Sequence, residues 1–125
     1  MFSLGPRSKM RLQGVHPDLV KVVERAIQIS TVDFTVLEGL RSPQRQRALY
    51  DAGASQTLNS RHITGHAVDL GAWVDDQIDW SWPLYIRIAG AMKMAAQELG
   101  VPIVCGIDWK MRDGPHHELD RKDYP

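Results

Sequence analysis

Apolar residues recur at helical spacing in two long stretches of this chain, and they predict two amphipathic helices. The first begins at Pro17, a residue that suits the first turn of a helix, and runs to about Ser30. The second runs from about Pro83 to Leu99 and ends at Gly100. Their buried stripes are predicted to be Leu19, Val22, Val23, Ala26 and Ile27 in the first helix, and Leu84, Ile88, Ala91, Met92, Ala95 and Leu99 in the second.

Between the two long helices, shorter patterns predict a strand followed by a small helix. Residues 34–40 are rich in β-formers and predict a strand that ends near Gly39. Ser42 and Pro43 are the residue types of a helix cap and first turn, and the helix that they open closes at Gly53.

The remaining segments predict strands joined by loops. Residues 66–72 alternate, so Val68 and Leu70 share one face and Asp69 lies on the other. The other predictions are a lead-in of loose structure at 1–14, a loop at 54–65, a turn or hairpin at 73–80, and strands at 103–105 and 116–119. Long helices combined with a few strands and hairpin-like links predict an α+β fold.

Composition narrows the class of protein. The chain has 125 residues, 43% hydrophobic and 24% charged, which predicts one folded domain over residues 1–125. Fifteen basic residues balance fifteen acidic ones, so charge does not indicate nucleic acid as a partner. Cys105 is the single cysteine, which excludes an internal disulfide, and the apolar run around it predicts a buried, unreactive thiol.

No stretch of the sequence reads as a targeting or membrane segment. Residues 1–7 lack the apolar run of a signal peptide, and no segment reaches the roughly 20 apolar residues of a membrane span. We therefore expect synthesis in the cytoplasm without stable membrane association, and we expect a monomer.

Four of the five histidines fall into two tight groups that also carry carboxylates. The first group is Ser60-Arg61-His62-Ile63-Thr64-Gly65-His66-Ala67-Val68-Asp69, and the second is Asp113-Gly114-Pro115-His116-His117-Glu118-Leu119. A catalytic zinc site takes three nitrogen or oxygen ligands and leaves a fourth position for water. Two separate segments that each bring imidazole and carboxylate groups therefore indicate such a site.

Strand alternation chooses between the adjacent histidines. In the last predicted strand, His117 shares a face with Leu119, and His116 shares the other face with Glu118. If Leu119 points into the core, His116 is free to meet Asp69. His66 and His117 are then expected in structural or supporting roles.

Hydrolysis at a metal also needs a carboxylate that is not a ligand, to move a proton from water to the leaving amine. Asp113 is three residues before His116 across a Gly-Pro turn, and Glu118 is the alternative. Arg41, where a strand gives way to a helix, is the candidate for stabilising the developing negative charge. The four tryptophans, Trp73, Trp80, Trp82 and Trp109, are expected to serve packing rather than to form carbohydrate platforms.

The two histidine groups also resemble a known family. Ser60 to Asp69 match the pattern Ser-x-His-x-x-Gly-x-Ala-x-Asp, and Asp113 to His116 match Asp-x-x-His. These patterns resemble the zinc D,D-carboxypeptidase and L-alanyl-D-glutamate endopeptidase family, and within it the phage endolysins. Further similarity lies in Gly14-Val15-His16-Pro17-Asp18-Leu19, Gly39-Leu40-Arg41-Ser42 and Gly106-Ile107-Asp108-Trp109, so the resemblance covers nearly the whole chain.

The resemblance implies a specific set of roles. His62, Asp69 and His116 match the zinc ligands, Asp113 the catalytic acid/base, Arg41 the arginine that polarises the substrate carbonyl, and Ser60 a residue near the substrate. It also implies a small domain with an antiparallel sheet flanked by helices. His117 departs from the pattern, because relatives commonly have an apolar or aromatic residue after the third ligand.

The function implied is that of a phage endolysin that cuts the L-alanyl-D-glutamate bond of bacterial peptidoglycan. Such an enzyme accumulates in the host cytoplasm and reaches the wall through holin-made pores, causing lysis. The same motifs are compatible with two alternative functions. One is D-Ala-D-Ala carboxypeptidase or dipeptidase activity with the same chemistry, and the other is a non-catalytic peptidoglycan-binding module that keeps the metal.

Overall fold

The central strand of the sheet is β2 (Ala67–Val74), as seen in a computed structural model that describes residues 1–125. Strand β1 (Phe34–Glu38) pairs antiparallel with one edge of β2. Strands β5 (His116–Leu119) and β3 (Gln77–Asp79) pair antiparallel with the other edge, toward opposite ends of β2. Strand β4 (Ile103–Cys105) extends the sheet beyond β5. The antiparallel α+β fold expected from the sequence is confirmed.

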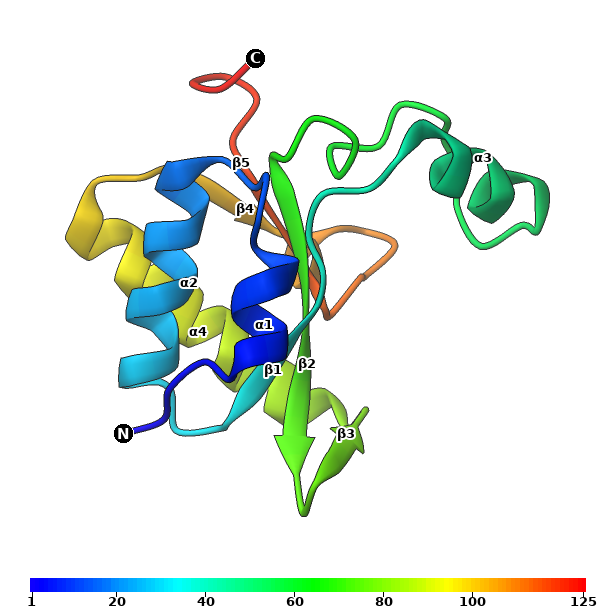
Figure 1. The fold of residues 1–125 in the computed structure, drawn as a ribbon. Helices are drawn as coiled ribbons and strands as arrows, with labels where there is room; N and C mark the ends of the chain where they lie inside the picture. Colours follow the sequence, from blue (N-terminus) through cyan, green and yellow to red (C-terminus); the bar gives the residue numbers. More distant parts are fainter.

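Two long helices cover one side of this sheet (Figure 1). Helix α2 (Pro17–Ile29) packs against α4 (Trp82–Leu99), which ends at Gly100 in the left-handed conformation. The side chains that are fully buried in this core include Leu19, Val22, Val23, Val36, Val68, Leu70, Ile88, Met92 and Leu119. Burying each of them contributes about 1.5–3 kcal/mol, so this layer supplies the main support of the sheet. No helix has the length and apolarity to cross a lipid bilayer.

The opposite side of the molecule carries a projecting arm, which we define as residues 43–59 (Figure 1). It contains α3 (Pro43–Asp51) and the loop that follows. The Ser42 hydroxyl caps α3 by accepting a hydrogen bond from the Arg45 backbone N–H, as its sequence predicted. Only one side chain of α3 is buried, that of Gln46, so the arm has no apolar contact stripe of its own.

Most predicted elements agree with the structure. The turn or hairpin expected at 73–80 is the β2–β3 hairpin, and Asp75 and Asp76 both have positive φ at its tip. The buried stripe of α4 is confirmed except at Leu99, which is exposed at the last turn, and at Leu84, which is half-buried. A short 3-10 turn at Gly106–Asp108, which the sequence pattern did not predict, follows β4.

The expectation of a loosely structured lead-in at residues 1–14 is wrong. Residues Pro6–Arg11 form helix α1, which packs against β1. The Ser8 hydroxyl accepts a hydrogen bond from Val36 N at 3.0 Å, and the Arg11 guanidinium donates to Val36 O at 2.9 Å. Pro6 begins this helix, because the fixed φ of proline suits the first helical position. A helix this short depends on tertiary contacts, which no local pattern reveals.

Candidate active site

The pairing of β2 with β5 places Asp69 directly opposite His116, so both side chains lie on the same face of the sheet. His116 Nδ1 is 3.3 Å from Asp69 Oδ1. The neighbouring His117 points to the other face, where it is fully buried, as Leu119 is. Strand alternation therefore correctly predicted that His116, and not His117, meets Asp69.

His62 reaches the same point from the loop that precedes β2. Its Nε2 atom is 3.2 Å from Asp69 Oδ1, and its Nδ1 atom is 2.9 Å from the carbonyl oxygen of Gly39. The loop is held in place because the Ser60 hydroxyl accepts a hydrogen bond from His62 N and the His62 carbonyl accepts one from Arg41 N. The structure therefore brings together the three residues that the resemblance assigned to the metal.

Two glycines let the N-terminal segment approach this loop closely. A Cβ on Gly39 would lie 2.3 Å from the Arg11 carbonyl oxygen, and one on Gly65 would lie 2.4 Å from that of Gly14. Gly65 also has a φ of +75°, which side chains disfavour. Its carbonyl oxygen accepts a hydrogen bond from His16 N at 2.8 Å. The N-terminal segment thus braces the loop that precedes β2.

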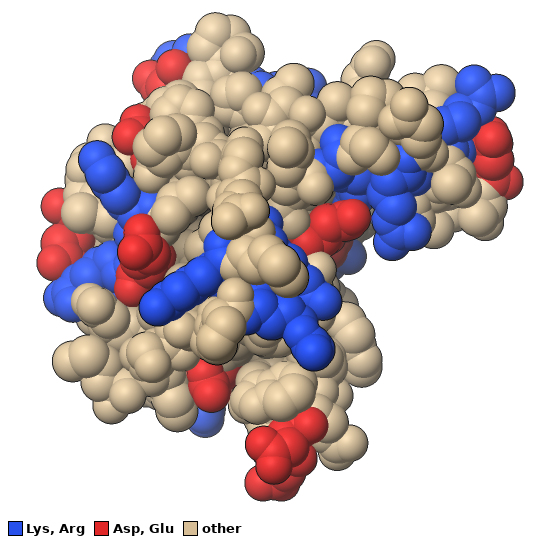
Figure 2. Space-filling model, in the orientation of Figure 1, with Lys and Arg blue, Asp and Glu red and all other residues tan.

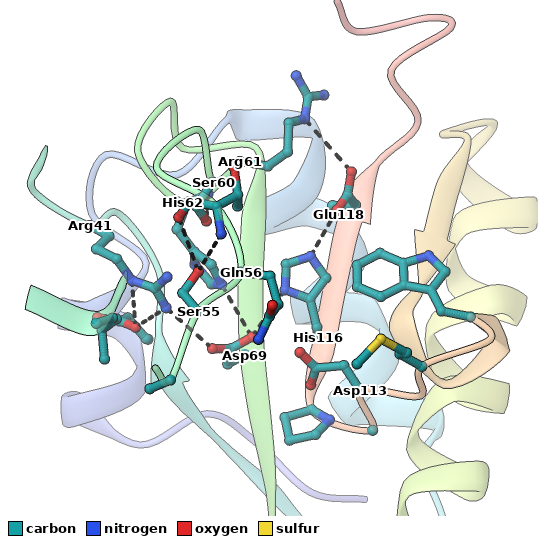
Figure 3. A pocket seen from close by; sticks show the side chains of 18 of the residues that line it. Arg41, Ser55, Gln56, Ser60, Arg61, His62, Asp69, Asp113, His116 and Glu118 are labelled. Carbon is teal, nitrogen blue, oxygen red and sulfur yellow. Dashed lines mark hydrogen bonds and ion pairs between the residues drawn. The ribbon is translucent and has the colours of Figure 1, made fainter. Parts of the chain in front are cut away.

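Glu118 supports His116 from the other side of the imidazole ring. Its Oε1 atom accepts a hydrogen bond from His116 Nε2 at 2.8 Å. Its Oε2 atom lies 3.8 Å from Arg61 Nε and 3.7 Å from Arg121 Nε. These contacts keep the Glu118 carboxylate engaged in orienting the ring (Figure 3).

The three groups fit a divalent metal ion. Ligand atoms of His62, Asp69 and His116 all lie within 4.8 Å of one another. One nitrogen of each ring already faces an acceptor, Gly39 O for His62 and Glu118 for His116. With a metal ion bound, each ring would be neutral, would keep its N–H on this acceptor and would offer the lone pair of its second nitrogen to the ion in place of the contact with Asp69. Two imidazole nitrogens and one carboxylate form a donor set that suits zinc.

The carboxyl groups of Asp69 and Asp113 have pKa values that are shifted in opposite directions. Burial raises the pKa of Asp69, but hydrogen bonds with His116 and His62 outweigh it and lower that pKa well below the usual range. Burial lowers the pKa of His116, whereas hydrogen bonds with Asp69 and Glu118 raise it to about 9. Burial and the Asp69 charge raise the pKa of Asp113. Asp69 thus suits a ligand, and Asp113 suits a group that takes and returns a proton.

Asp113 is held at the site by the turn before β5. Its N–H donates to Gly106 O at 3.0 Å, and its carbonyl oxygen accepts from His116 N at 3.3 Å. Two residues later in the same turn, the Pro115 carbonyl oxygen accepts a hydrogen bond from Leu70 N, which ties the turn to β2. In Figure 3 the Asp113 carboxylate points toward the space between the labelled ligands.

Arg41 follows β1 in the chain and lies beside the candidate metal-binding group of His62, Asp69 and His116. Its guanidinium donates to Glu38 Oε1 from two nitrogens, and its Nη2 atom is 3.7 Å from Asp69 Oδ2. Its Nη1 atom donates to Gln46 Oε1 at 2.7 Å. The Arg41 side chain is nearly buried and has a fixed direction, and its guanidinium lies beside Asp69.

Gln46 is a residue at this site that the sequence interpretation missed. Its side chain is fully buried, and its amide nitrogen donates to Ser55 Oγ at 2.8 Å and to Thr57 O at 2.6 Å. Its amide oxygen accepts from Arg41. One amide therefore ties the arm to the arginine of the site. Nothing in the polar sequence of α3 marks it, because its partners come from other segments.

An open cleft of about 960 Å³ lies between the arm and the sheet, and its lining includes Arg41, His62, Asp69, Asp113 and His116. In Figure 2 the surface is hollowed beneath the arm, and both basic and acidic side chains lie around the hollow. The arm side of the cleft is polar and contains Arg41, Arg45, Ser55, Gln56, Thr57, Asn59 and Ser60. The opposite side contains three tryptophans, Trp80, Trp82 and Trp109, which we call the aromatic wall.

The expectation that the tryptophans serve packing is wrong for the aromatic wall. Trp80, Trp82 and Trp109 expose 63%, 48% and 37% of their surface and line the cleft. Trp73 is 37% exposed but lies outside this cleft. The indole rings lie on connecting segments or at the start of α4, where helical or strand periodicity says nothing about burial.

Two other sequence predictions are confirmed. The Cys105 thiol is buried, and burial raises its pKa to about 11, which makes it unreactive. His66 lies away from the cleft, where its ring pairs with Thr64 Oγ1 at 2.7 Å and lies beside His16. His117 is buried as a neutral ring, because burial lowers its pKa to about 3.

Two phage peptidases are similar to this chain in sequence. The chain is 32% identical over 127 residues to the L-alanyl-D-glutamate peptidase of Escherichia phage T5, covering 98% of this chain and 93% of the phage protein. It is 29% identical to the L-alanyl-D-glutamate peptidase of Listeria phage A118 over 94 residues, which cover 74% of this chain and 32% of that protein.

Solved structures agree in fold. The Serratia marcescens L-Ala D-Glu endopeptidase ChiX superposes with a TM-score of 0.92 at 50% identity, over 96% of this chain and 91% of the other. The vancomycin resistance D,D-dipeptidase VanXYg shares the fold with a TM-score of 0.57 at 20% identity, over 84% of this chain and 50% of the other. The sequence profile of the phage L-alanyl-D-glutamate peptidases matches residues 1–125 in full, and the chain therefore belongs to that family.

Proposed function

We propose that this protein is a zinc-dependent endopeptidase that hydrolyses the L-alanyl-D-glutamate bond of bacterial peptidoglycan, with residues 1–125 acting as one catalytic domain. The observation that carries the proposal is the convergence of His62 Nε2 and His116 Nδ1 on Asp69 Oδ1, beside a separate carboxylate, Asp113, in an open cleft. Membership in the peptidase family supports the choice of bond.

The chain supplies each group that hydrolysis requires. A zinc ion, when bound, supplies a Lewis acid that acidifies water and polarises the scissile carbonyl. Asp113 accepts the proton of the water that attacks the carbonyl carbon of L-alanine. As the carbon–nitrogen bond breaks, Asp113 returns this proton to the amine of D-glutamate. The raised pKa of Asp113 suits this alternation, because a carboxyl group that protonates more readily is a better acid in the second step.

Arg41 is proposed to stabilise the negative charge that develops on the carbonyl oxygen. Its guanidinium is held by Glu38 and Gln46, so little reorganisation is needed when that charge appears. Ser60 lines the same cleft and shapes the loop of His62 through its hydroxyl. We propose that it also lies near the bound substrate.

The open cleft favours an endopeptidase over the carboxypeptidase and dipeptidase alternatives. A dipeptidase has to enclose a short substrate and capture its free carboxylate, whereas an endopeptidase has to admit a chain that continues on both sides of the bond. A cleft of about 960 Å³ with a polar side and an aromatic side offers room for such a chain. The presence of Asp113 beside the ligands argues against a module that only binds peptidoglycan, since binding needs no acid/base.

In its biological setting, the protein is proposed to act as a phage endolysin. It would be made in the host cytoplasm as a monomer and would reach the peptidoglycan through holin-type pores. Two of its sequence relatives are phage L-alanyl-D-glutamate peptidases, which supports this role.

The test is mass spectrometry of purified peptidoglycan after digestion with the zinc-loaded protein, with a chelated sample as the control. The proposal predicts stem peptides with a new D-glutamate N-terminus only in the zinc-loaded sample. Release of D-alanine would instead identify a carboxypeptidase. Binding to the wall without any new amino group would identify a binding module.

A further inference from the structure

The aromatic wall is a further surface of the cleft, and its construction differs from that of a packed core. The Trp80 ring lies parallel to the Tyr85 ring, with an interplanar angle of 4° and ring centroids 6.0 Å apart. Tyr85 is buried, and its hydroxyl donates to Asp79 O and accepts from Ala72 N. Tyr85 therefore packs against Trp80 from one side, while 63% of the Trp80 surface stays exposed to solvent and the residue lines the cleft.

The wall is continuous with the proposed catalytic groups. The Trp82 ring lies against the turn that carries Asp113, because a Cβ on Gly114 would come within 3.2 Å of it. The Trp109 ring centroid is 5.0 Å from that of His116. A group bound at the Trp109 end of the aromatic wall would therefore lie beside the proposed metal site.

The chemistry of the two sides of the cleft assigns them to different parts of the substrate. The arm side carries Arg45 next to Arg41, and the Arg45 guanidinium suits a carboxylate of the D-glutamate half. The half that ends in L-alanine is uncharged and is joined through its amino group to a muramoyl sugar of the glycan. A pyranose ring has an apolar C–H face, and a rigid indole with one open face is the surface that such a ring stacks on.

We propose, building on the peptidase function above, that the aromatic wall is a saccharide subsite that binds the glycan sugar next to the L-alanine residue. Trp80 is the stacking platform, and Trp82 and Trp109 line the path from it to the scissile bond. The subsite favours peptide that is still attached to the glycan over stem peptide that an amidase has already released.

The test compares two substrates with the same stem peptide, one carrying the disaccharide and one without it. The wild-type protein is expected to cleave both at the same bond, with a higher kcat/KM for the disaccharide form. Trp80→Ala should lower the ratio of the two kcat/KM values about five- to tenfold, the size of one aromatic stacking contact. Trp80→Phe should restore part of the ratio.

The chain provides a matched control in Trp73, which is as exposed as Trp109 but lies outside the cleft. Trp73→Ala should leave the ratio unchanged. Equal losses on both substrates in Trp80→Ala would assign the wall to the peptide and overturn the proposal. If the wild type cleaved neither substrate at this bond, the proposed function itself would fail, which is a different outcome.

A second measurement does not depend on how Trp80→Ala folds. The peptide-free disaccharide is titrated into the wild-type protein, and the four indole N–H signals are followed by NMR, with Trp80 identified from Trp80→Phe. The Trp80 signal is expected to shift and the Trp73 signal to stay. A Trp80 signal that does not move at millimolar disaccharide would overturn the subsite.

Discussion

The two sides of the cleft are held in place by different forces. On the sheet side, Asp69 and His116 belong to paired strands whose other face is packed against α2 and α4. On the arm side, α3 buries one side chain, Gln46, and that residue is polar. The ligand group thus inherits the rigidity of a hydrophobic core, whereas the arm depends on a few hydrogen bonds. Substitutions on the two sides should accordingly change different measurable quantities.

The largest effect is expected from removing one of the three residues proposed to bind zinc. His62→Ala should lose zinc and reduce hydrolysis to the background level, because two remaining ligands do not complete a catalytic site. Zinc content after dialysis, measured by plasma mass spectrometry, checks this. His66→Ala, a histidine outside the cleft, is the matched control and should keep its metal. Unchanged zinc in His62→Ala would refute the ligand assignment.

The next effect separates chemistry from metal binding on the same side. Asp113→Asn should keep zinc and lower kcat by about 10²–10⁴-fold, the contribution of a general acid/base. The wild-type rate should fall as pH decreases through the raised pKa of Asp113, since the base must be deprotonated to accept a proton. This fall in rate at acidic pH should be absent in Asp113→Asn. A variant with wild-type turnover would move the acid/base role to Glu118.

A smaller effect is expected from the carboxylate that orients His116. Glu118→Gln keeps an acceptor for His116 Nε2 but removes the negative charge. Zinc affinity should fall about 10–100-fold, as is usual when a partner of a ligating histidine is changed. Competition with a zinc chelator of known affinity measures this. Unaltered affinity together with lost turnover would show that Glu118 takes part in the proton transfer.

The smallest effect is expected from the arm. Gln46→Met fills the same space but removes the hydrogen bonds that Gln46 makes with Arg41 Nη1, Ser55 Oγ and Thr57 O. A buried group that this leaves unsatisfied, such as Arg41 Nη1, costs about 1–3 kcal/mol. Because the core is untouched, zinc content should stay the same. If about 1.4 kcal/mol of that cost raises the activation free energy, kcat should fall by roughly tenfold. Loss of zinc in this variant would show that the two sides of the cleft are not independent.

Sequence patterns predicted the sheet side far better than the arm side. Alternation along 66–72 and 116–119 predicted that Asp69 and His116 share a face, and the strand register confirms it. The motif then placed His62 with them. The same patterns could not reveal that Gln46 is buried, because α3 has no apolar stripe and its burial comes from loop residues that fold back over it.

The sequence by itself determined the two long helices, the strand faces and the residue types of the metal group. These follow from spacing along one element, since side chains two residues apart in a strand or three to four apart in a helix share a face. Only the tertiary structure decided which groups surround the ligands. The contacts of Gln46 with Arg41 and of Trp80 with Tyr85 depend on side-chain direction and on packing between separate segments. Such contacts form only when separate elements pack together, and no local sequence pattern specifies that packing.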